Sequence, residues 1–184
     1  NMLANEMFLD SADLRSSVVS KAKQVGYTPN SSISSTAVID VVVNDATGAS
    51  LTMSRGTTFT STVNGQSYSF LNNADVTITP DNGVYKFSNL NVKEGTFLNF
   101  KYTASTSDLE QRFIIPNDNV DTTTLTVKVQ NSSSDSTTNT YTLANGITGL
   151  DPTSQVYFLQ EVENGRVEVY SGDGVLGKAI ADGN

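Results

Sequence analysis

The sequence contains no cysteine, no histidine and no tryptophan, and only 4 prolines among its 184 residues. Histidine and cysteine supply the commonest general base, transition-metal ligand and thiolate nucleophile, so their absence removes much of enzymatic chemistry. Carboxylates, lysine, tyrosine and hydroxyl groups remain. The composition therefore predicts a protein that is not an enzyme, with no catalytic residue, no cofactor and no metal site. A fold held by disulfides is excluded as well.

Positive charge is also scarce. The 11 lysines and arginines face 19 acidic residues, which gives a formal net charge of -8. Nucleic-acid affinity depends on neutralising phosphates, and anionic membrane surfaces attract basic proteins. No apolar stretch reaches the roughly 18 residues that a membrane span needs, and the opening NMLANEMFLD lacks the basic and apolar regions of a signal peptide. The predicted partners therefore include no nucleic acid, no membrane and no small-molecule substrate.

One helix is predicted near the N-terminus, from Ser11 to Val25. Asp10 or Ser11 can cap its first turn, and Gly26 can end it. Apolar residues recur at steps of four, four and three, which places them on one helical face. They are Leu14, Val18, Ala22 and Val25.

After Ser31, short β-branched runs alternate with turn residues, a pattern typical of β structure. Asn-Gly at 64–65 is a turn signal between two predicted strands, and Asn-Gly at 164–165 predicts a two-residue hairpin turn. The polar residues 131–139 predict a loop. In the strand predicted at 97–103, Leu98, Phe100 and Tyr102 are expected to face inward. Strands are predicted at 37–43, 50–54, 57–63, 68–71, 76–79, 84–90, 97–103, 112–115, 124–129, 140–143, 156–162 and 167–170.

The pattern breaks at residues 103–108, where no apolar period is present. We therefore predict an N-terminal helical segment at 1–33, a β domain at 34–103 and a second β-rich domain at 104–184. The fold class is mainly β (α+β), an N-terminal helix followed by two small β domains of antiparallel or mixed sheet. Turns about every ten residues suggest a sandwich or partly closed barrel.

Several blocks resemble a known family. The stretch from Thr36 to Tyr102 has Gly-Thr-Thr-Phe at 56–59, Gly-Gln-Ser-Tyr at 65–68 and Glu-Gly at 94–95, an order similar to the baseplate J-like family of contractile phage tails. More specific are the opening block 4–15 leading to Val-Gly-Tyr-Thr-Pro at 25–29, Gln-Arg-Phe-Ile-Ile-Pro-Asn at 111–117, and residues 163–178. Together these resemble the baseplate wedge subunits of T-even-type contractile-tailed phages over nearly the whole chain.

The resemblance implies a structural component of the virion tail baseplate, assembled in the host cytoplasm. It implies docking surfaces for neighbouring wedge subunits during assembly and sheath contraction. The implied partners are other baseplate wedge proteins and copies of the intact protein. It also implies an internal piece of a longer protein, with a second β domain truncated at its C-terminus, and Asn1 and the turn-rich end agree with this expectation. The alternative is a β-sandwich carbohydrate-binding or adhesion module, which hydroxyl-rich strands and aromatic residues would suit.

The sharpest site-like motif is Gly-Asp-Gly-Val-Leu-Gly-Lys at 172–178, which has the glycine and lysine spacing of a phosphate loop. Ala179 stands where that loop needs serine or threonine, and Asp173 would bring negative charge toward the phosphates. A glycine-rich turn is the favoured interpretation.

Two clusters of acidic residues have both a possible functional role and a structural one. Glu161, Glu163 and Glu168 lie on or beside the 156–170 hairpin and could form the carboxylate pair of a glycosidase, but such strand carboxylates are usually solvated. Asp118, Asn119 and Asp121 lack the glycine and glutamate of a calcium loop and are predicted to cap their own loop.

Aromatic residues cluster on neighbouring predicted strands. They could form a stacking platform for sugars or bases, but the spacing favours a core role. The residues are Tyr68, Phe70, Tyr85, Phe87, Phe97, Phe100 and Tyr102. Lys86, Lys93 and Lys101 are expected on a solvated sheet face.

Overall fold

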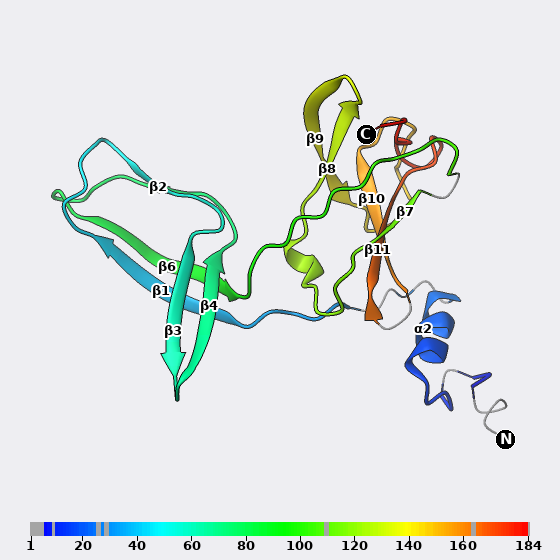
Figure 1. Cartoon of the computed structure of the whole chain (residues 1–184), viewed down its shortest axis with the longest axis horizontal. Coiled ribbons are helices and arrows are strands. Elements are labelled where there is room, and N and C mark those ends of the chain that lie inside the picture. Colours follow the sequence, from blue (N-terminus) through cyan, green and yellow to red (C-terminus); the bar gives the residue numbers. More distant parts are fainter. Residues whose placement is uncertain are drawn as a thin grey trace. The chain divides into compact units, whose positions relative to one another are not determined.

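The computed structural model describes residues 6–8, 10–24, 27, 30–108, 111–162 and 165–183 (Figure 1). The described chain is mainly β with one short helix near the N-terminus, which confirms the predicted fold class. It divides into two compact units, unit 1 (1–32 and 100–184) and unit 2 (33–99). The predicted three-part division at 33/34 and 103/104 stays a prediction, since compactness does not show which segments fold alone. Among the described residues, no helix is long and apolar enough to cross a bilayer.

Helix α2 (Arg15–Gln24) begins later than the predicted start at Ser11. Just ahead of it, the Glu6 carboxylate accepts the backbone N–H groups of Asp13 (3.1 Å) and Leu14 (3.3 Å). The predicted inward face is partly wrong: Leu14 is 46% exposed, while Val19 and Ala22 are buried. Val25 and Gly26 lie outside the described residues.

Unit 2 is built on a four-stranded antiparallel sheet in the order β1-β6-β4-β3. Its strands are β1 (Thr36–Val43), β3 (Thr58–Val63), β4 (Gln66–Asn72) and β6 (Tyr85–Glu94), and a separate antiparallel ribbon pairs β2 (Leu51–Met53) with β5 (Val76–Ile78). Alternate residues of β6 form the core of the sheet. Tyr85, Phe87, Leu90 and Val92 are buried and lie opposite Val43, Val41, Ile39 and Ala37 of β1.

A bulge in β6 keeps this buried row on one face. Between the pairs Ile39–Leu90 and Val41–Phe87, β6 contains one residue more than β1. The extra residue is accommodated at Asn89, whose φ of 54° lies in the left-handed region. Asp40 holds the bulge: its carboxylate accepts the Asn89 N–H (2.8 Å) and pairs with Lys86 Nζ (2.9 Å). Phe87 and Leu90 therefore both face inward although they are three residues apart.

The β3–β4 hairpin extends beyond the rest of the sheet. β3 and β4 pair from Thr58–Leu71 to Val63–Gln66, but β4 meets β6 only from Phe70 to Asn72. Residues 60–69, called the arm below, are therefore a two-stranded ribbon, seen in Figure 1 as the lower end of β3 and β4. Asn64 and Gly65 have φ angles of 51° and 80°, as a two-residue type I′ turn requires, which confirms the predicted turn.

Unit 1 contains a five-stranded mixed sheet in the order β7-β11-β10-β9-β8. The elements are the 3-10 turn η1 (Thr122–Thr124), β7 (Arg112–Ile114), β8 (Val127–Ser132), β9 (Asp135–Leu143), β10 (Val156–Glu161) and β11 (Val167–Ser171). The β9–β10 pair is parallel and the other pairs are antiparallel. Val129, Tyr141 and Tyr157 form the centre of its core, and burial raises the pKa of both tyrosines.

Two predicted elements in this half of the chain were wrong. Residues 97–103 are not a strand, and Leu98, Phe100 and Tyr102 are 55%, 43% and 40% exposed. Alternating apolar residues make a strand only where a neighbour supplies backbone partners, and this segment has no strand paired to it. Residues 131–139 are not an open loop. They belong to the β8–β9 hairpin, in which the strand pairing continues as far as Ser132 and Asp135.

Candidate functional site

The glycine-rich segment 172–178 is a closed turn. Asp173 Oδ1 accepts the backbone N–H groups of Leu176 (2.8 Å) and Val175 (2.9 Å), and both bonds lower the pKa of Asp173. The Gly174 N–H bonds to the Gly177 carbonyl (3.0 Å). A phosphate loop needs its amide groups open toward the ligand and a helix after them, and residues 179–183 form no helix. This geometry does not suit nucleotide binding.

Close backbone packing explains two of the glycines in this turn. A Cβ atom on Gly172 would lie 2.2 Å from the carbonyl carbon of Gly177. A Cβ atom on Gly177 would lie 2.8 Å from Val156 Cγ2, and the φ of Gly177 is 91°. Real Cβ contacts are longer than this, so both positions require glycine for packing.

A second loop, residues 144–154, is joined to this turn. Asp151 Oδ1 accepts the Thr153 hydroxyl (2.7 Å), the Thr153 N–H (2.8 Å) and the Ser154 hydroxyl (3.0 Å), which together lower the pKa of Asp151. The Gly177 N–H bonds to the Asp151 carbonyl (3.1 Å), and the Lys178 N–H bonds to the Ser154 carbonyl (2.8 Å). We call residues 144–154 and 172–178 the loop pair.

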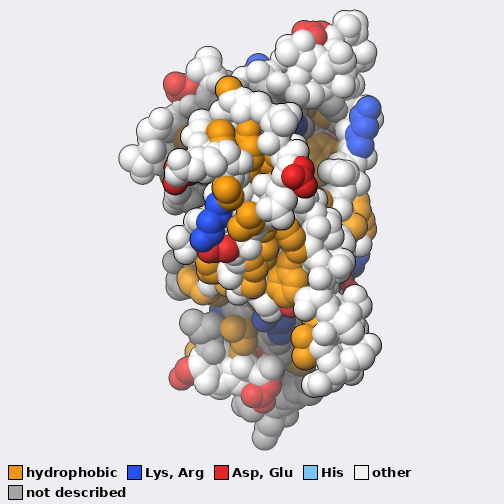
Figure 2. Space-filling view, turned by 90° about the vertical axis from the view of Figure 1, so that its left-hand side faces the viewer, with side chains coloured by type: hydrophobic (Ala, Val, Ile, Leu, Met, Phe, Trp, Pro, Cys, Tyr) orange, Lys and Arg blue, Asp and Glu red, His pale blue; other side chains and the backbone are white. Residues whose placement is uncertain are grey.

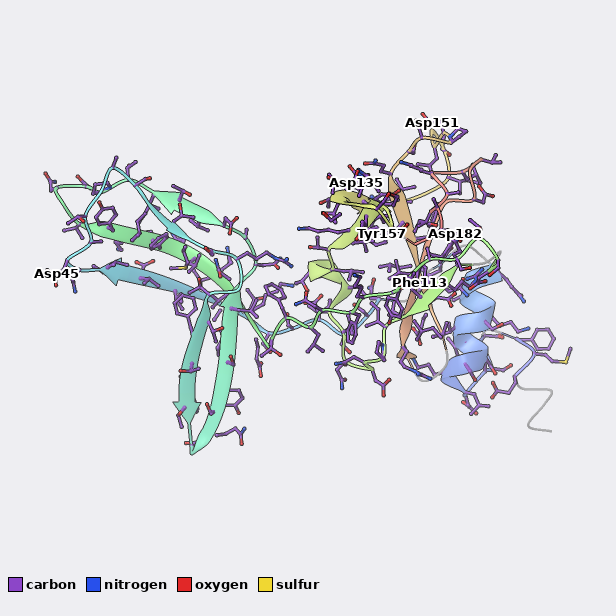
Figure 3. All side chains as sticks on the ribbon, turned by 45° about the horizontal axis from the view of Figure 1, so that its top comes forward. Asp45, Phe113, Asp135, Asp151, Tyr157 and Asp182 are labelled. Carbon is purple, nitrogen blue, oxygen red and sulfur yellow. The ribbon has the colours of Figure 1, made fainter. Side chains whose placement is uncertain are left out.

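The loop pair presents apolar side chains on a fixed backbone. Ile147 is 62% exposed, Val175 is 67% exposed and Leu176 is 37% exposed. Figure 3 shows Asp151 at one end of unit 1, beyond the strand ends. Rigid loops with exposed apolar tips are suited to docking because little conformational entropy is lost on binding. Sequence reasoning identified residues 172–178 but missed 144–154, although Asp-Pro-Thr-Ser at 151–154 is a turn signal.

Unit 2 also leaves apolar side chains exposed. On β1, Val38 and Val42 are 61% and 50% exposed, on the face opposite to the core. Figure 2 shows hydrophobic side chains at the surface, with acidic and basic side chains beside them. The charged Asp40, paired with Lys86, lies between these two valines on the same face, so they are separate exposed apolar side chains and do not form one patch.

The predicted carboxylate group does not converge. Glu161 lies opposite Val167 and Glu168 lies opposite Gln160 in the β10–β11 pair, so the two side chains point to opposite faces of the sheet. Each is buried and paired with an arginine: Glu161 with Arg15 (2.8 Å) and Glu168 with Arg112 (2.5 Å). This arrangement does not provide a glycosidase pair, and Glu163 lies outside the described residues.

The 117–121 loop uses its polar groups on its own backbone. Asn117 Oδ1 accepts the Asn119 N–H (2.8 Å), and Asp121 Oδ1 accepts the Thr123 N–H (2.9 Å) ahead of η1. Asp118 lies 3.8 Å from Arg166. No group of three potential metal-ligating side chains occurs within the part of the chain that the structure describes.

The aromatic residues differ in burial. Tyr85 and Phe87 are core residues, as predicted, whereas Tyr68, Phe100 and Tyr102 are 37%, 43% and 40% exposed, which contradicts a core role. Their partial exposure does not make a sugar platform. Tyr102 packs at a tilt on Phe113, with 5.4 Å between ring centroids, and donates its hydroxyl hydrogen to the Ile114 carbonyl.

Other ring faces are occupied by neighbours. The Phe158 and Tyr170 rings stack at 5.2 Å and 17°, and the Arg112 guanidinium covers Tyr170 at 4.9 Å. Arg55 covers Phe97 at 4.1 Å. Sugars and bases bind by stacking on open ring faces, so these contacts do not favour the carbohydrate-binding interpretation.

Lys86 and Lys93 occupy the same outward face of β6, and Lys86 is paired with Asp40. Lys101 belongs to the other unit. The expectation that all three lysines share one sheet face is therefore wrong, since Lys101 is not on a strand.

Comparison with known proteins agrees with the resemblance seen in the sequence. No family model matches the chain. The chain is 27% identical to the baseplate wedge protein gp6 of Enterobacteria phage T4 over 187 aligned residues, which cover the whole chain. The chain is similar to a baseplate wedge protein from end to end. It spans 27% of the length of that relative, in agreement with the predicted resemblance to part of a longer wedge subunit.

Proposed function

We propose that this chain is part of a structural component of a contractile-tail baseplate wedge, located in the virion tail. The observation that carries the proposal is the similarity of the whole chain to a baseplate wedge protein. The geometry supports it, because the buried acidic groups are engaged in ion pairs and hydrogen bonds and the glycine-rich turn is closed on itself. In this role the chain provides a rigid surface that neighbouring wedge subunits contact during assembly and sheath contraction.

The loop pair supplies one docking surface in this proposal. Its backbone is fixed by carboxylate and amide hydrogen bonds before any partner arrives, and its apolar tips Ile147, Val175 and Leu176 are exposed. Burying such side chains in a partner stabilises a complex by roughly 25 cal/mol for each Å² of apolar surface. Because the backbone is already ordered, little of this free energy is lost to conformational entropy on binding.

The test is assembly of the intact protein. We expect it to form a stable complex with the other wedge proteins encoded by the same phage when they are co-expressed, observed by size-exclusion chromatography and native mass spectrometry. Failure to associate under conditions in which the remaining wedge proteins assemble would refute the proposal.

The role of the loop pair is tested separately. Val175→Asp places a charge on the exposed tip and is expected to weaken the complex, while the melting temperature of the free protein changes little. The matched control is Val84→Asp, because Val84 is a 49% exposed valine in unit 2, outside the loop pair. Equal effects of the two substitutions would contradict the assignment of the docking surface.

A further inference from the structure

The open edge of β3 differs from the open edges of β1, β7 and β8, the other strands that end the two large sheets. Natural proteins protect exposed edges with charges, bulges or short strands, because an unpaired edge is a template for another strand. β1 carries the charged Asp40, paired with Lys86, β8 carries Lys128, and β7 is a three-residue strand beginning with Arg112. β3 (Thr58–Val63) has none of these devices, and all of unit 2 is described by the structure.

Charge is absent well beyond this strand. From Gly56 to Ala74 the sequence contains no charged residue, although the whole chain has a net charge of -8. Two copies of an acidic chain repel each other, and the repulsion is least where both surfaces are neutral. The arm is such a surface, since it projects from the sheet and carries hydroxyl, amide and apolar side chains only.

The hydrogen-bonding groups that face the open edge can be identified. The Asn72 N–H bonds to the Thr57 carbonyl (3.2 Å), one step before the Thr58–Leu71 pair. Because bonded and non-bonded positions alternate along an antiparallel pair, the odd-numbered residues of β3 bond to β4. The N–H and C=O groups of Thr58, Thr60 and Thr62 therefore point away from β4, toward the open edge.

We propose that this edge pairs with the same edge of a second copy, antiparallel and centred on Ser61. Even-numbered residues must then meet even-numbered residues, and Thr60 of one copy exchanges backbone hydrogen bonds with Thr62 of the other. Phe59 lies opposite Val63, and Ser61 lies opposite Ser61. Aromatic pairs with β-branched residues and threonine pairs are favourable neighbours across strands, so β3 is complementary to itself.

The association is expected to be weak. A six-residue strand contributes much less than the roughly 800 Å² that each partner buries in a stable complex. A weak pairing of this kind becomes stronger wherever two copies are held near each other, because their effective concentration is then high. It goes beyond the baseplate proposal and does not depend on it, because it concerns the chain alone.

Sedimentation equilibrium of the 184-residue chain tests whether a second copy pairs with the β3 edge. We expect a reversible dimer with a dissociation constant of about 0.1–1 mM, which tightens as salt screens the repulsion between copies. Thr60→Lys should weaken the dimer about tenfold or more, because a lysine on an edge strand disfavours pairing with another strand. Ser67→Lys, which adds the same charge on the other strand of the arm, should have a small effect. A chain that stays monomeric at millimolar concentration, or a dimer weakened by salt, overturns the proposal.

The register is tested by single-cysteine variants, which the absence of native cysteine makes unambiguous. In the proposed register two Ser61 residues form a non-hydrogen-bonded pair, whose Cα atoms are about 4.5 Å apart and within disulfide range. Ser61→Cys should therefore oxidise to a disulfide dimer many times faster than Ser67→Cys, as measured by non-reducing electrophoresis. Equal rates overturn the proposed pairing.

Discussion

Arg15 and Glu161, 146 positions apart in the chain, form a two-pronged ion pair in which Nε and Nη2 of the arginine each donate to a carboxylate oxygen over 2.8 Å. The Glu161 side chain is 6% exposed, whereas that of Arg15 is 65% exposed. Hydrogen bonding to Glu161 raises the pKa of Arg15. The pair connects helix α2 to the end of β10, so it joins the segments that precede and follow unit 2 in the chain.

Arg15→Ala should destabilise the chain. Removing one partner of a fully buried ion pair costs about 3–5 kcal/mol, but solvent already screens the exposed Arg15 side, so we expect a loss of about 1–2 kcal/mol. Urea unfolding followed by circular dichroism measures this free energy. Arg15→Lys should recover only part of the loss, because an ammonium group cannot make the two parallel bonds.

The control for this pair is Lys21→Ala on the same helix. A surface substitution of this kind changes the unfolding free energy by about 0.5 kcal/mol or less. If Arg15→Ala were no more destabilising than Lys21→Ala, the pair would contribute nothing to the docking of α2.

Gly172→Ala should be among the most damaging small substitutions. The added Cβ would lie 2.2 Å from the carbonyl carbon of Gly177, which is backbone and cannot move aside as a side chain can. We expect a loss of about 3 kcal/mol or more, the range in which overpacking becomes severe. Gly146→Ala in the other loop of the pair is the matched control, because its Cβ would meet nothing within 4 Å. Similar melting temperatures for the two variants would show that the glycine contact in the turn is not tight.

Asp40→Ala should loosen the bulge of β6. The carboxylate accepts the Asn89 N–H, and this bond, followed by that from Lys86, lowers the pKa of Asp40. Without it, the Asn89 amide loses its acceptor and should exchange with deuterium faster, while amides at the Thr36 end of β1 are little changed. Asp40→Asn keeps an acceptor oxygen and should retain most of the protection. Unchanged exchange at Asn89 in Asp40→Ala would exclude the proposed clamp.

Local signals in the sequence accounted for much of the β architecture. The Asn64-Gly65 turn and the β-branched runs located β1 to β6, since turn conformation and strand propensity are short-range properties. The strand at 97–103 was wrong because pairing partners are not visible in local alternation. The β8–β9 hairpin was missed because its strands are rich in serine, threonine and asparagine, which also mark loops.

The candidate site was less accessible to sequence reasoning. Glu161 and Glu168 were grouped by proximity in the sequence, but a difference of one position in register sends them to opposite faces. Their partners Arg15 and Arg112 lie 146 and 56 positions away, and no local pattern specifies such pairs. The closed form of residues 172–178 depends on Asp151 and Ser154, which belong to another loop.

Stability should fall in acid and stay flat near neutrality. Hydrogen bonds lower the pKa of five aspartates below the ordinary value of 3.8. The leading donors are the Asn89 N–H for Asp40, the Asn131 amide for Asp135, the Thr153 hydroxyl for Asp151, the Leu176 N–H for Asp173 and the Thr106 N–H for Asp182.

A carboxyl group with a lower pKa in the folded state binds fewer protons there than in the unfolded state. Its stabilising contribution is therefore complete above the unfolded-state pKa and is lost as the pH falls through the folded-state pKa. The urea midpoint should change little from about pH 7 to pH 5, where the chain has no histidine to titrate, and should decline below about pH 4. Asp151→Asn and Asp173→Asn should each reduce the slope of that decline, because they remove one of the titrating groups. A midpoint that rises below pH 4 would contradict the assignment of these aspartates as hydrogen-bonded anions.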